Sequence, residues 1–470
     1  MSSGTGDGGA VSACALASTA AVYTLPTLAS APVRPLASLS GSLVAAGQSL
    51  PVPLSGSVAC AGGASQLAYE LIDMNADGYA DLVVTSSCGD PAVGATIWLV
   101  YAGGASGFAT TAASYALAPA PGAGCATQTA LVDVGGDGRP DWVVTSTCND
   151  TSVGTSRWLV YANGASGFAQ AATPYALPRG LSTGAFTAMS QAASACTGGQ
   201  DAPAFAFFDI TGDGKPDLVM TQTCSDASIG TSAWSVFAGS GTGVAQTAAP
   251  FPLPATPIFT AGAFASPGGA LVCSAQVSRP AFGLFDFNGD GKLDLVITEA
   301  CGDATVGETR WLGYENGGAG FAAQPAALTL PRLGGAASPA FGAFAAGGSC
   351  TQGGAQPAYS LVDGNGDGRL DLLVTHDCAD AQTGTGYWQL FVNDGAGFAS
   401  SARHLALPAA IGATYASPIG LTSALSCAAP VRPAAVAAYF PRGLALVVTG
   451  DCADGTVGQS RWLLYPASCP

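Results

Sequence analysis

Aspartate, asparagine and glycine recur at fixed spacing in five segments of the chain. The segments read DMNADGYAD from Asp73, DVGGDGRPD from Asp133, DITGDGKPD from Asp209, DFNGDGKLD from Asp286 and DGNGDGRLD from Asp363. Positions 1, 3, 5 and 9 carry side-chain oxygens in most copies, position 7 can offer its backbone carbonyl, and glycine at position 6 permits a tight turn. Hard cations such as calcium take about six to eight oxygen ligands. The spacing therefore predicts calcium sites with a structural role.

The predicted ligands of each calcium site are the residues at positions 1, 3, 5, 7 and 9. They are Asp73, Asn75, Asp77, Tyr79 and Asp81; Asp133, Gly135, Asp137, Arg139 and Asp141; Asp209, Thr211, Asp213, Lys215 and Asp217; Asp286, Asn288, Asp290, Lys292 and Asp294; and Asp363, Asn365, Asp367, Arg369 and Asp371. Gly135 offers no side-chain ligand, so the second site should be the weakest. The alternative is a turn that needs aspartate and glycine for its conformation alone. Three carboxylates so close together would then repel one another, and this favours a cation.

The loops belong to a longer repeat. Their starts are 60, 76, 77 and 77 residues apart, and a sixth copy around residues 439–452 lacks the acidic positions. Each copy is read as four short strands: one ending at the first aspartate of the loop, an LVVT run, a WLVY run, and a run that ends in YALP or a relative. Four strands in each of six units predict an all-β chain that forms a six-bladed β-propeller.

The two ends of the chain are expected to meet. The last unit stops after its third strand at RWLLYPASCP, while the chain starts with CALASTAAVYTLP, which matches the fourth-strand run FATTAASYALAP. The N-terminal strand is therefore predicted to complete the last blade. We expect a flexible Gly/Ser tail at residues 1–10 and a single domain at 11–470. Its blades are expected at about 60–119, 120–179, 180–254, 255–332, 333–409, and 410–470 together with 11–27.

The fourteen cysteines follow the same period. They form no CxxC pair, which excludes zinc and thioredoxin-type sites. Their spacing predicts one disulfide in each unit and one more where the ends meet: Cys60–Cys88, Cys125–Cys148, Cys196–Cys224, Cys273–Cys301, Cys350–Cys378, Cys427–Cys452 and Cys14–Cys469. Free buried thiols would have no reason to keep this register. Disulfides persist in oxidising compartments, so we expect an extracellular protein, secreted or on the cell surface. The start MSSGTGDGGA does not resemble a secretory signal and is interpreted as a mature or engineered start.

Charged residues are sparse and mostly acidic. Of 470 residues, 30 are acidic and 14 are Lys or Arg, while 49% are hydrophobic. This composition favours a folded chain over a disordered one, and it lacks the basic surface that nucleic acid or an anionic membrane requires. No stretch of 18 apolar residues predicts a membrane-spanning segment. Because 15 of the 30 acidic residues lie in the five loops, the surface left for partners is expected to be poor in charge.

The repeats resemble a known family. The Asp-rich loops, followed at once by DLVVT or DLVIT and later by GF, are similar to the FG-GAP (VCBS) repeats of integrin α-subunit propellers and of calcium-bearing propeller lectins. The resemblance covers residues 60–465. It implies calcium in the hairpin between the first two strands, on one face of the ring, and ligands held by loops on the other face or between blades. Six units and a disulfide in every unit depart from the usual pattern, so no particular ligand is carried over.

Other repeated residues are expected to serve the fold. Each third strand contains a tryptophan, which we interpret as core packing rather than a sugar-stacking platform: Trp98, Trp158, Trp234, Trp311, Trp388 and Trp462. Arg157, Arg310 and Arg461 precede three of them and should point to the opposite face of the strand. An aspartate follows the second cysteine of each unit and is expected to cap the next turn: Asp90, Asp150, Asp226, Asp303, Asp380 and Asp454.

Nothing in the sequence indicates a catalytic site. His376 and His404 are the only histidines, and they stand at opposite ends of the strand order of one unit. The string GLSTG at residues 180–184 matches a nucleophile elbow but lacks the strand and helix that this motif requires. We therefore expect that the protein is not an enzyme.

The long connections from each fourth strand to the next unit, such as PRGLSTGAFTAMSQAASACTGGQ, are almost uncharged and are candidates for a binding surface. The alternative is that they only pack over the ring. The sequence thus predicts a secreted or cell-surface, calcium-stabilised β-propeller that acts as a binding or adhesion module for a glycan or protein ligand. A structural subunit of an extracellular filament or matrix, formed by self-association, is the first alternative. An enzyme with an unrecognised site is the second.

Overall fold

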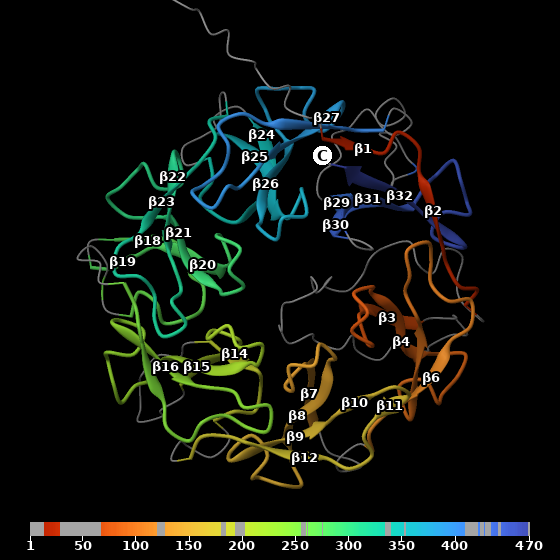
Figure 1. Ribbon diagram of the computed structural model, residues 1–470, viewed down its shortest axis with the longest axis vertical. Helices are drawn as coiled ribbons and strands as arrows, with labels where there is room; N and C mark the ends of the chain where they lie inside the picture. The colour runs from red at the N-terminus through yellow and green to blue at the C-terminus, as the bar shows by residue number, and fades with distance from the viewer. Residues whose placement is uncertain are drawn as a thin grey trace, which may run out of the picture.

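The computed structural model describes residues 14–28, 67–119, 127–179, 185–192, 203–254, 260, 262–274, 276–333, 340–351, 354–408, 422–423, 427, 434–439 and 443–468. Every helix or strand assigned within these ranges is a β-strand, so the prediction of an all-β chain is confirmed. The strands are arranged around a ring, as in a β-propeller (Figure 1). No helix long and apolar enough to cross a membrane occurs in the described part of the chain.

The described strands include six groups of four antiparallel neighbours, here called units one to six. They are β3 (Leu67–Ile72), β4 (Asp81–Ser87), β5 (Ile97–Tyr101) and β6 (Ala113–Ala116); β7 (Thr127–Val132), β8 (Asp141–Thr147), β9 (Arg157–Tyr161) and β12 (Thr173–Ala176); β14 (Ala204–Phe208), β15 (Asp217–Gln222), β16 (Ala233–Phe237) and β17 (Ala249–Pro252); β20 (Ala281–Phe285), β21 (Asp294–Glu299), β22 (Arg310–Tyr314) and β23 (Ala326–Thr329); β25 (Gly354–Val362), β26 (Asp371–His376), β27 (Tyr387–Phe391) and β28 (Arg403–Ala406); and β30 (Ala434–Tyr439), β31 (Leu444–Gly450), β32 (Arg461–Ser468) and β2 (Ala21–Thr24).

Shorter strands complete the described secondary structure. They are β1 (Ala15–Leu16), β10 (Asn163–Gly164), β11 (Gly167–Phe168), β13 (Ser190–Gln191), β18 (Val272–Cys273), β19 (Ser278–Arg279), β24 (Ala345–Thr351) and β29 (Thr422–Ser423). In unit two, the first strand β7 lies toward the centre of the ring and the fourth strand β12 lies at its outer edge (Figure 1).

The N-terminal strand pairs with the last unit, as the sequence predicts. β2 runs antiparallel to β32, with Ala21 opposite Leu464 and Tyr23 opposite Trp462. The side chains of Tyr23 and Leu25 are buried there, because the YTL sequence alternates between the solvent and the interior. The first described strands of the chain therefore supply what the C-terminal unit lacks.

Neighbouring units are joined by a short parallel bridge that the sequence analysis did not foresee. The GF segment before the fourth strand of one unit, which reads GV in unit three, pairs with the fourth strand of the preceding unit, and we call this segment the latch. The paired residues include Thr24 with Gly107, Ala116 with Gly167, Ala176 with Gly243, and Thr329 with Gly397, and the N–H of Phe321 donates to the carbonyl of Pro252. At the junction of units five and six, β1 takes the place of the latch, with Ala15 opposite Ala406.

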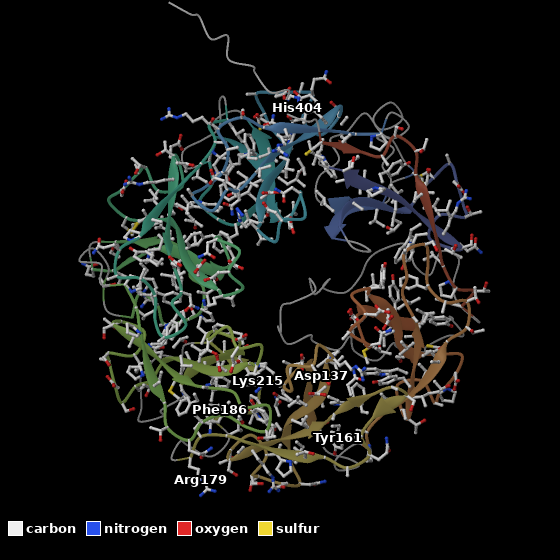
Figure 2. The ribbon with its side chains drawn as sticks, viewed as in Figure 1. Asp137, Tyr161, Arg179, Phe186, Lys215 and His404 are labelled. Atoms are coloured by element: carbon white, nitrogen blue, oxygen red, sulfur yellow. A yellow bond between two sulfur atoms is a disulfide. The ribbon has the colours of Figure 1, made fainter. Side chains whose placement is uncertain are left out.

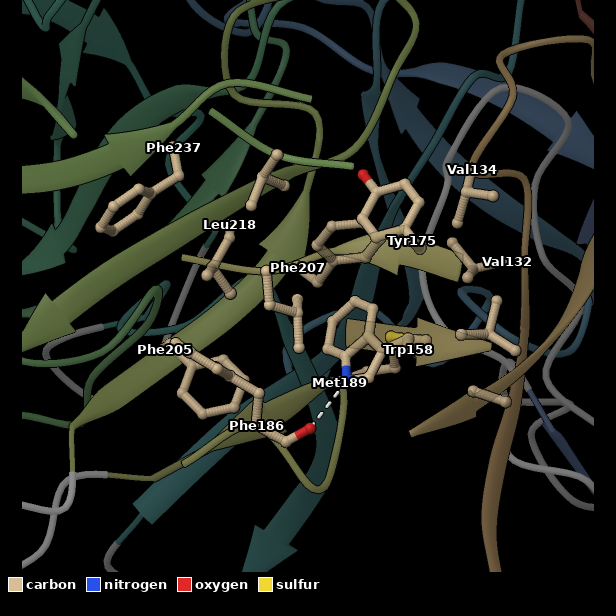
Figure 3. Packing of buried hydrophobic residues seen from close by; sticks show 14 of the residues in the cluster. Val132, Val134, Trp158, Tyr175, Phe186, Met189, Phe205, Phe207, Leu218 and Phe237 are labelled. Atoms are coloured by element: carbon tan, nitrogen blue, oxygen red, sulfur yellow. Dashed lines mark hydrogen bonds between the residues drawn. The ribbon is translucent and has the colours of Figure 1, made fainter. Parts of the chain in front are cut away.

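The hydrophobic core is divided into six clusters, each lying between two neighbouring units. The third-strand tryptophans lie in these clusters and are at most 3% exposed, which confirms that they pack in the core. In four junctions the phenylalanine of the latch meets the tryptophan of the preceding unit edge to face, at centroid distances of 5.5–5.6 Å. Figure 3 shows the cluster between units two and three, where Trp158 packs beside Tyr175 and Phe207.

Candidate functional site

The backbone of the five Asp-rich loops turns through positive φ angles at two positions. Position 6 is glycine in every loop, with φ between 82° and 87°. Position 4 also has a positive φ and is glycine in four loops, but Ala76 occupies it in the first loop with φ 61°. Residues other than glycine rarely adopt a positive φ. The requirement at position 4 was not recognised from the sequence, although the four glycines were visible there.

In each loop the carboxylates at positions 1 and 5 accept hydrogen bonds from the loop backbone. In the fourth loop, Asp286 accepts from the N–H groups of Gly289, Asp290 and Gly291 at 2.7–3.2 Å, and Asp290 accepts from the N–H of Lys292 at 2.9 Å. The other loops repeat this arrangement with small variations. The aspartates therefore shape the turn, whatever else they bind.

The carboxylate at position 9 is buried and connects two parts of its unit. Asp294 is fully buried; it accepts from the N–H of Phe287 within the loop at 3.1 Å and from the N–H of Asn316, after the third strand, at 2.7 Å. The equivalent aspartates also accept from the residue after the third strand, at 2.7–2.9 Å. Burial raises the pKa of these carboxyls, to about 6 in Asp81, Asp141 and Asp217 and to about 7 in Asp294 and Asp371, although the amide hydrogen bonds oppose the shift.

The loops carry the oxygen ligands that calcium prefers, but these carboxylate oxygens accept hydrogen bonds from backbone N–H groups. A carboxylate oxygen can accept more than one partner, so the donor chemistry fits a hard cation. Within the residues that the structure describes, however, no three His, Cys, Asp or Glu side chains come together closely enough to hold a metal ion. In the fourth loop, Lys292 also pairs with Asp290 at 3.2 Å. Calcium binding therefore requires the loop carboxylates to turn toward a shared ion, and it stays a prediction.

A buried asparagine connects the loops of neighbouring units. The amide of Asn316, in unit four, donates to the carbonyl of Ile210 in the loop of unit three at 2.8 Å and to its own Leu293 at 3.0 Å. Asn163 and Asn393 make the equivalent bonds to the preceding loops at 3.1 Å and 2.9 Å. Side chains of successive loops also lie close together near the inner edge of the ring, where Asp137 and Lys215 are seen (Figure 2). The sequence signal, an asparagine two residues after the aromatic end of the third strand, was not used.

The aspartate after the second cysteine caps the turn between the second and third strands in every unit. Its Oδ1 accepts from the N–H two residues later at 2.9–3.0 Å, as expected. Arg157, Arg310 and Arg461 then pair with Asp150, Asp303 and Asp454 at 2.6–2.9 Å, seven residues away in each case. Bonds from Thr456 and Arg461 lower the pKa of Asp454 to about 2. The spacing of these ion pairs was present in the sequence but was not recognised there.

The described parts of the long connections pack on the ring. Phe186, Phe264 and Phe341 are buried, and their carbonyls accept from the indole N–H of Trp158, Trp234 and Trp311 at 2.7 Å. Figure 3 shows the first of these bonds. These described segments cover the core. They behave as the alternative expects in which the long connections only pack over the ring. The string at residues 180–184 and the tail at 1–10 lie outside the described residues.

The structure contains two of the predicted disulfides, Cys273–Cys301 and Cys427–Cys452. Cys14, Cys88, Cys148, Cys224 and Cys378 are disulfide-bonded as well. Their predicted partners Cys469, Cys60, Cys125 and Cys196 lie outside the described residues, and the side chain of Cys350 is not described. These five pairings stay predictions.

Comparisons with known proteins show no family for this chain. No protein-family model and no curated protein matches it. Among solved structures, it is similar to the Photorhabdus luminescens Tc holotoxin pore, with 18% identity over 84% of this chain and a TM-score of 0.43. The chain spans only 14% of that protein. An Agrocybe aegerita lectin that recognises terminal N-acetylglucosamine has 16% identity over 72% of this chain and 66% of its own, with a TM-score of 0.34. The V. cholerae biofilm matrix protein Bap1 has 13% identity over 99% of this chain and 90% of its own, with a TM-score of 0.22. At these levels the likenesses carry no argument about function.

Proposed function

We propose that this protein is a six-bladed, calcium-stabilised β-propeller, secreted or held at the cell surface, that acts as a binding or adhesion module for a glycan or protein ligand. The ring would close through β1 and β2 at the sixth blade. The FG-GAP-like loops support membership of that family of propellers.

The observation that carries this proposal is that the repeated polar side chains bind the backbone of the scaffold itself. The aspartates at position 9, the capping aspartates and the indole N–H groups all bind backbone atoms of their own or a neighbouring segment. A repeat whose polar groups hold the scaffold in this way gives a rigid ring, and rigid scaffolds commonly carry binding residues on the surface segments that they position. His376 lies at the end of β26 and His404 on β28, which supports a role without catalysis.

Calcium would be held by the loop residues at positions 1, 3, 5, 7 and 9. When bound, it would supply positive charge to three carboxylates in each loop, and thereby strengthen the hairpin between the first two strands. The nine cysteines found in disulfides support an oxidising compartment.

A binding screen tests the proposal. The oxidised protein, with calcium, is applied to an array of immobilised neutral glycans and to intact cells. Selective binding to a defined set of glycans, or saturable binding to cells, supports a binding module. Binding to neither would overturn it. Particle imaging of the same sample tests the filament alternative, because open head-to-tail chains would contradict a discrete module.

A further inference from the structure

Unit five differs from the other units at four positions that the fold brings together. Thr383 stands where other units have valine or isoleucine, and Gln389 stands where four of them have leucine. Tyr387 replaces an arginine, isoleucine or alanine, and His404 occupies the exposed fourth-strand position held elsewhere by Ser114, Pro174, Pro250, Ala327 and Val22. All four replacements introduce a polar or aromatic group into one unit of a regular ring.

Three of these side chains, Thr383, Tyr387 and Gln389, form one hydrogen-bond network with the capping Asp380. The hydroxyl of Tyr387 donates to Oδ2 of Asp380 at 2.6 Å, and the hydroxyl of Thr383 donates to the same oxygen at 2.8 Å. The amide of Gln389 donates to Thr383 at 2.7 Å and to Asp380 at 3.2 Å. Thr383 and Gln389 are buried at 1% and 8% exposure, where a polar group costs stability unless it is hydrogen-bonded. The network holds the Tyr387 ring in a fixed orientation.

His404 completes the arrangement at the outer side of the ring (Figure 2). Its imidazole stacks on the Tyr387 ring, with 3.9 Å between centroids and 7° between planes. His404 is exposed, and neighbouring Ala406 on the same strand is small and exposed. The result is a pair of stacked rings, with His404 exposed and Tyr387 half-buried, supported by a buried network.

We propose that Tyr387 and His404 form a stacking platform for a neutral sugar residue of a glycan ligand. The C–H groups on one face of a pyranose carry slight positive charge and pack on the face of a flat ring, while the imidazole nitrogens can exchange hydrogen bonds with the sugar hydroxyls at the edge. The inference rests on the proposed binding function and names its ligand class and site.

The charges around the platform favour a neutral ligand. In units two, four and six the capping aspartate pairs with arginine, whereas Asp380 is held by neutral donors alone, so the exchange removes a cation from this position. An anionic ligand would meet Asp380 with no counter-charge in that network. A cationic ligand would have to compete for Asp380 with Tyr387, Thr383 and Gln389, which already donate to its Oδ2.

The test restores the pattern of unit four in unit five. In the double variant Tyr387→Arg, His404→Ala, the arginine can pair with Asp380 as Arg310 pairs with Asp303, so the variant should fold. The single variant His404→Ala changes only an exposed side chain and keeps the test valid if the double variant does not fold. Ser114→Ala, at the equivalent position in unit one, is the matched control.

Two measurements test whether the ligand binds at Tyr387 and His404. On the neutral-glycan array, both unit-five variants should bind at least about tenfold more weakly than the wild type, a loss of about 1.4 kcal/mol, while Ser114→Ala binds normally. The second measurement is proton NMR of the wild type, where the signals are few because the chain has only two histidines. Methyl glycosides of the bound sugar should shift the ring protons of His404 but not those of His376.

The outcomes separate the site from the proposed function. Wild-type binding that the variants keep within twofold, with no shift of the His404 signals, would place the ligand elsewhere and overturn the platform while the binding function stands. Binding to cells or proteins but to no neutral glycan would also overturn the platform and leave a protein-binding module. No binding of any kind would overturn both.

Discussion

Single buried asparagines connect neighbouring units at three junctions of this ring. Asn316 is an example, because it is 1% exposed and its side chain satisfies a carbonyl in its own unit and another in the unit before it. Its oxygen also accepts from the N–H of Gly318 at 2.8 Å. Each such residue supplies hydrogen bonds to several backbone groups that burial has removed from water.

Asn316→Ala should lower the free energy of unfolding by about 1–3 kcal/mol, because the carbonyls of Ile210 and Leu293 lose their donor. Urea unfolding, followed by tryptophan fluorescence in the presence of a chelator, measures the change. Asn288→Ala, which removes only a local hydrogen bond to the N–H of Asp290 in the same unit's loop, is the control and should lower stability less than Asn316→Ala does. Equal effects of the two variants would contradict the connecting role of Asn316.

The pKa of Asp454 predicts a dependence of stability on acid. The side-chain hydrogen bond from Thr456 has the largest effect and that from Arg461 the next largest. Together they hold the pKa of Asp454 at about 2 in the folded protein, below the value of about 3.9 for an unfolded chain. The carboxylate therefore contributes stability above about pH 4 and loses it as the pH falls toward 2. The thermal midpoint of Asp454→Asn should lie below that of the wild type at pH 5, and the difference should vanish near pH 2. A difference that does not change with pH would contradict this assignment.

At the scale of elements, the latches join units whose own sheets are separate. Each latch places a glycine against the backbone of the preceding fourth strand. The closest case is Gly397, whose φ is 134° and where an added Cβ would lie 2.2 Å from the amide nitrogen of Thr329. Only glycine permits this approach, so the GF sequence follows from contact between neighbours rather than from the strand itself.

Gly397→Ala should force the latch away from β23 and lower the free energy of unfolding by about 1–3 kcal/mol. Hydrogen exchange should show faster exchange of the Thr329 and Phe398 amides, which are bonded across this junction. The control is Gly347→Ala on β24, where an added Cβ meets no atom within 4 Å. Unchanged protection of Thr329 in the Gly397 variant would show that the latch is not a stable contact.

Sequence reasoning reached the elements more easily than their contacts. The short β-branched and aromatic runs LVVT and WLVY predict strands, and an aspartate two residues after cysteine predicts a cap, because both depend on local backbone geometry. The latch depends on how close two units lie, which no single repeat encodes. Tyr387 and His404 were visible as departures from the repeat, but they stand 17 residues apart on neighbouring strands, and only their pairing brings the rings together. The position-9 aspartate was recognised as a ligand, while its bonds to the turn after the third strand were not.

At the scale of the whole molecule, the loops fall into two connected groups. The buried asparagines join the loops of units one and two, three and four, and four and five. Unit three has Gly239 at the equivalent position and makes no such side-chain bond. These side-chain bonds therefore connect the loops of units one and two and the loops of units three to five.

Removal of calcium should lower the thermal midpoint of the oxidised protein. A site that binds calcium at 100 times its dissociation constant adds about 2.7 kcal/mol, so chelation should shift the midpoint by several degrees. Calcium added back should restore the midpoint, whereas an equal concentration of magnesium should not, because magnesium requires a tighter octahedral site. Identical midpoints in calcium and in chelator would show that the loops need no metal.

The pairing of β2 with β32 sets an order of events during synthesis. Tyr23 and Trp462 stack face to face, yet 439 residues separate them in the chain. At about 5–20 residues per second, the ribosome takes roughly 20–90 s to make the partner of the first strand. Throughout that interval Tyr23 and Leu25 can pack only against unit one, where the Tyr23 ring meets Phe108 at a centroid distance of 5.0 Å. The sheet of unit six can therefore be completed by β2 only after Trp462 and its strand have been made.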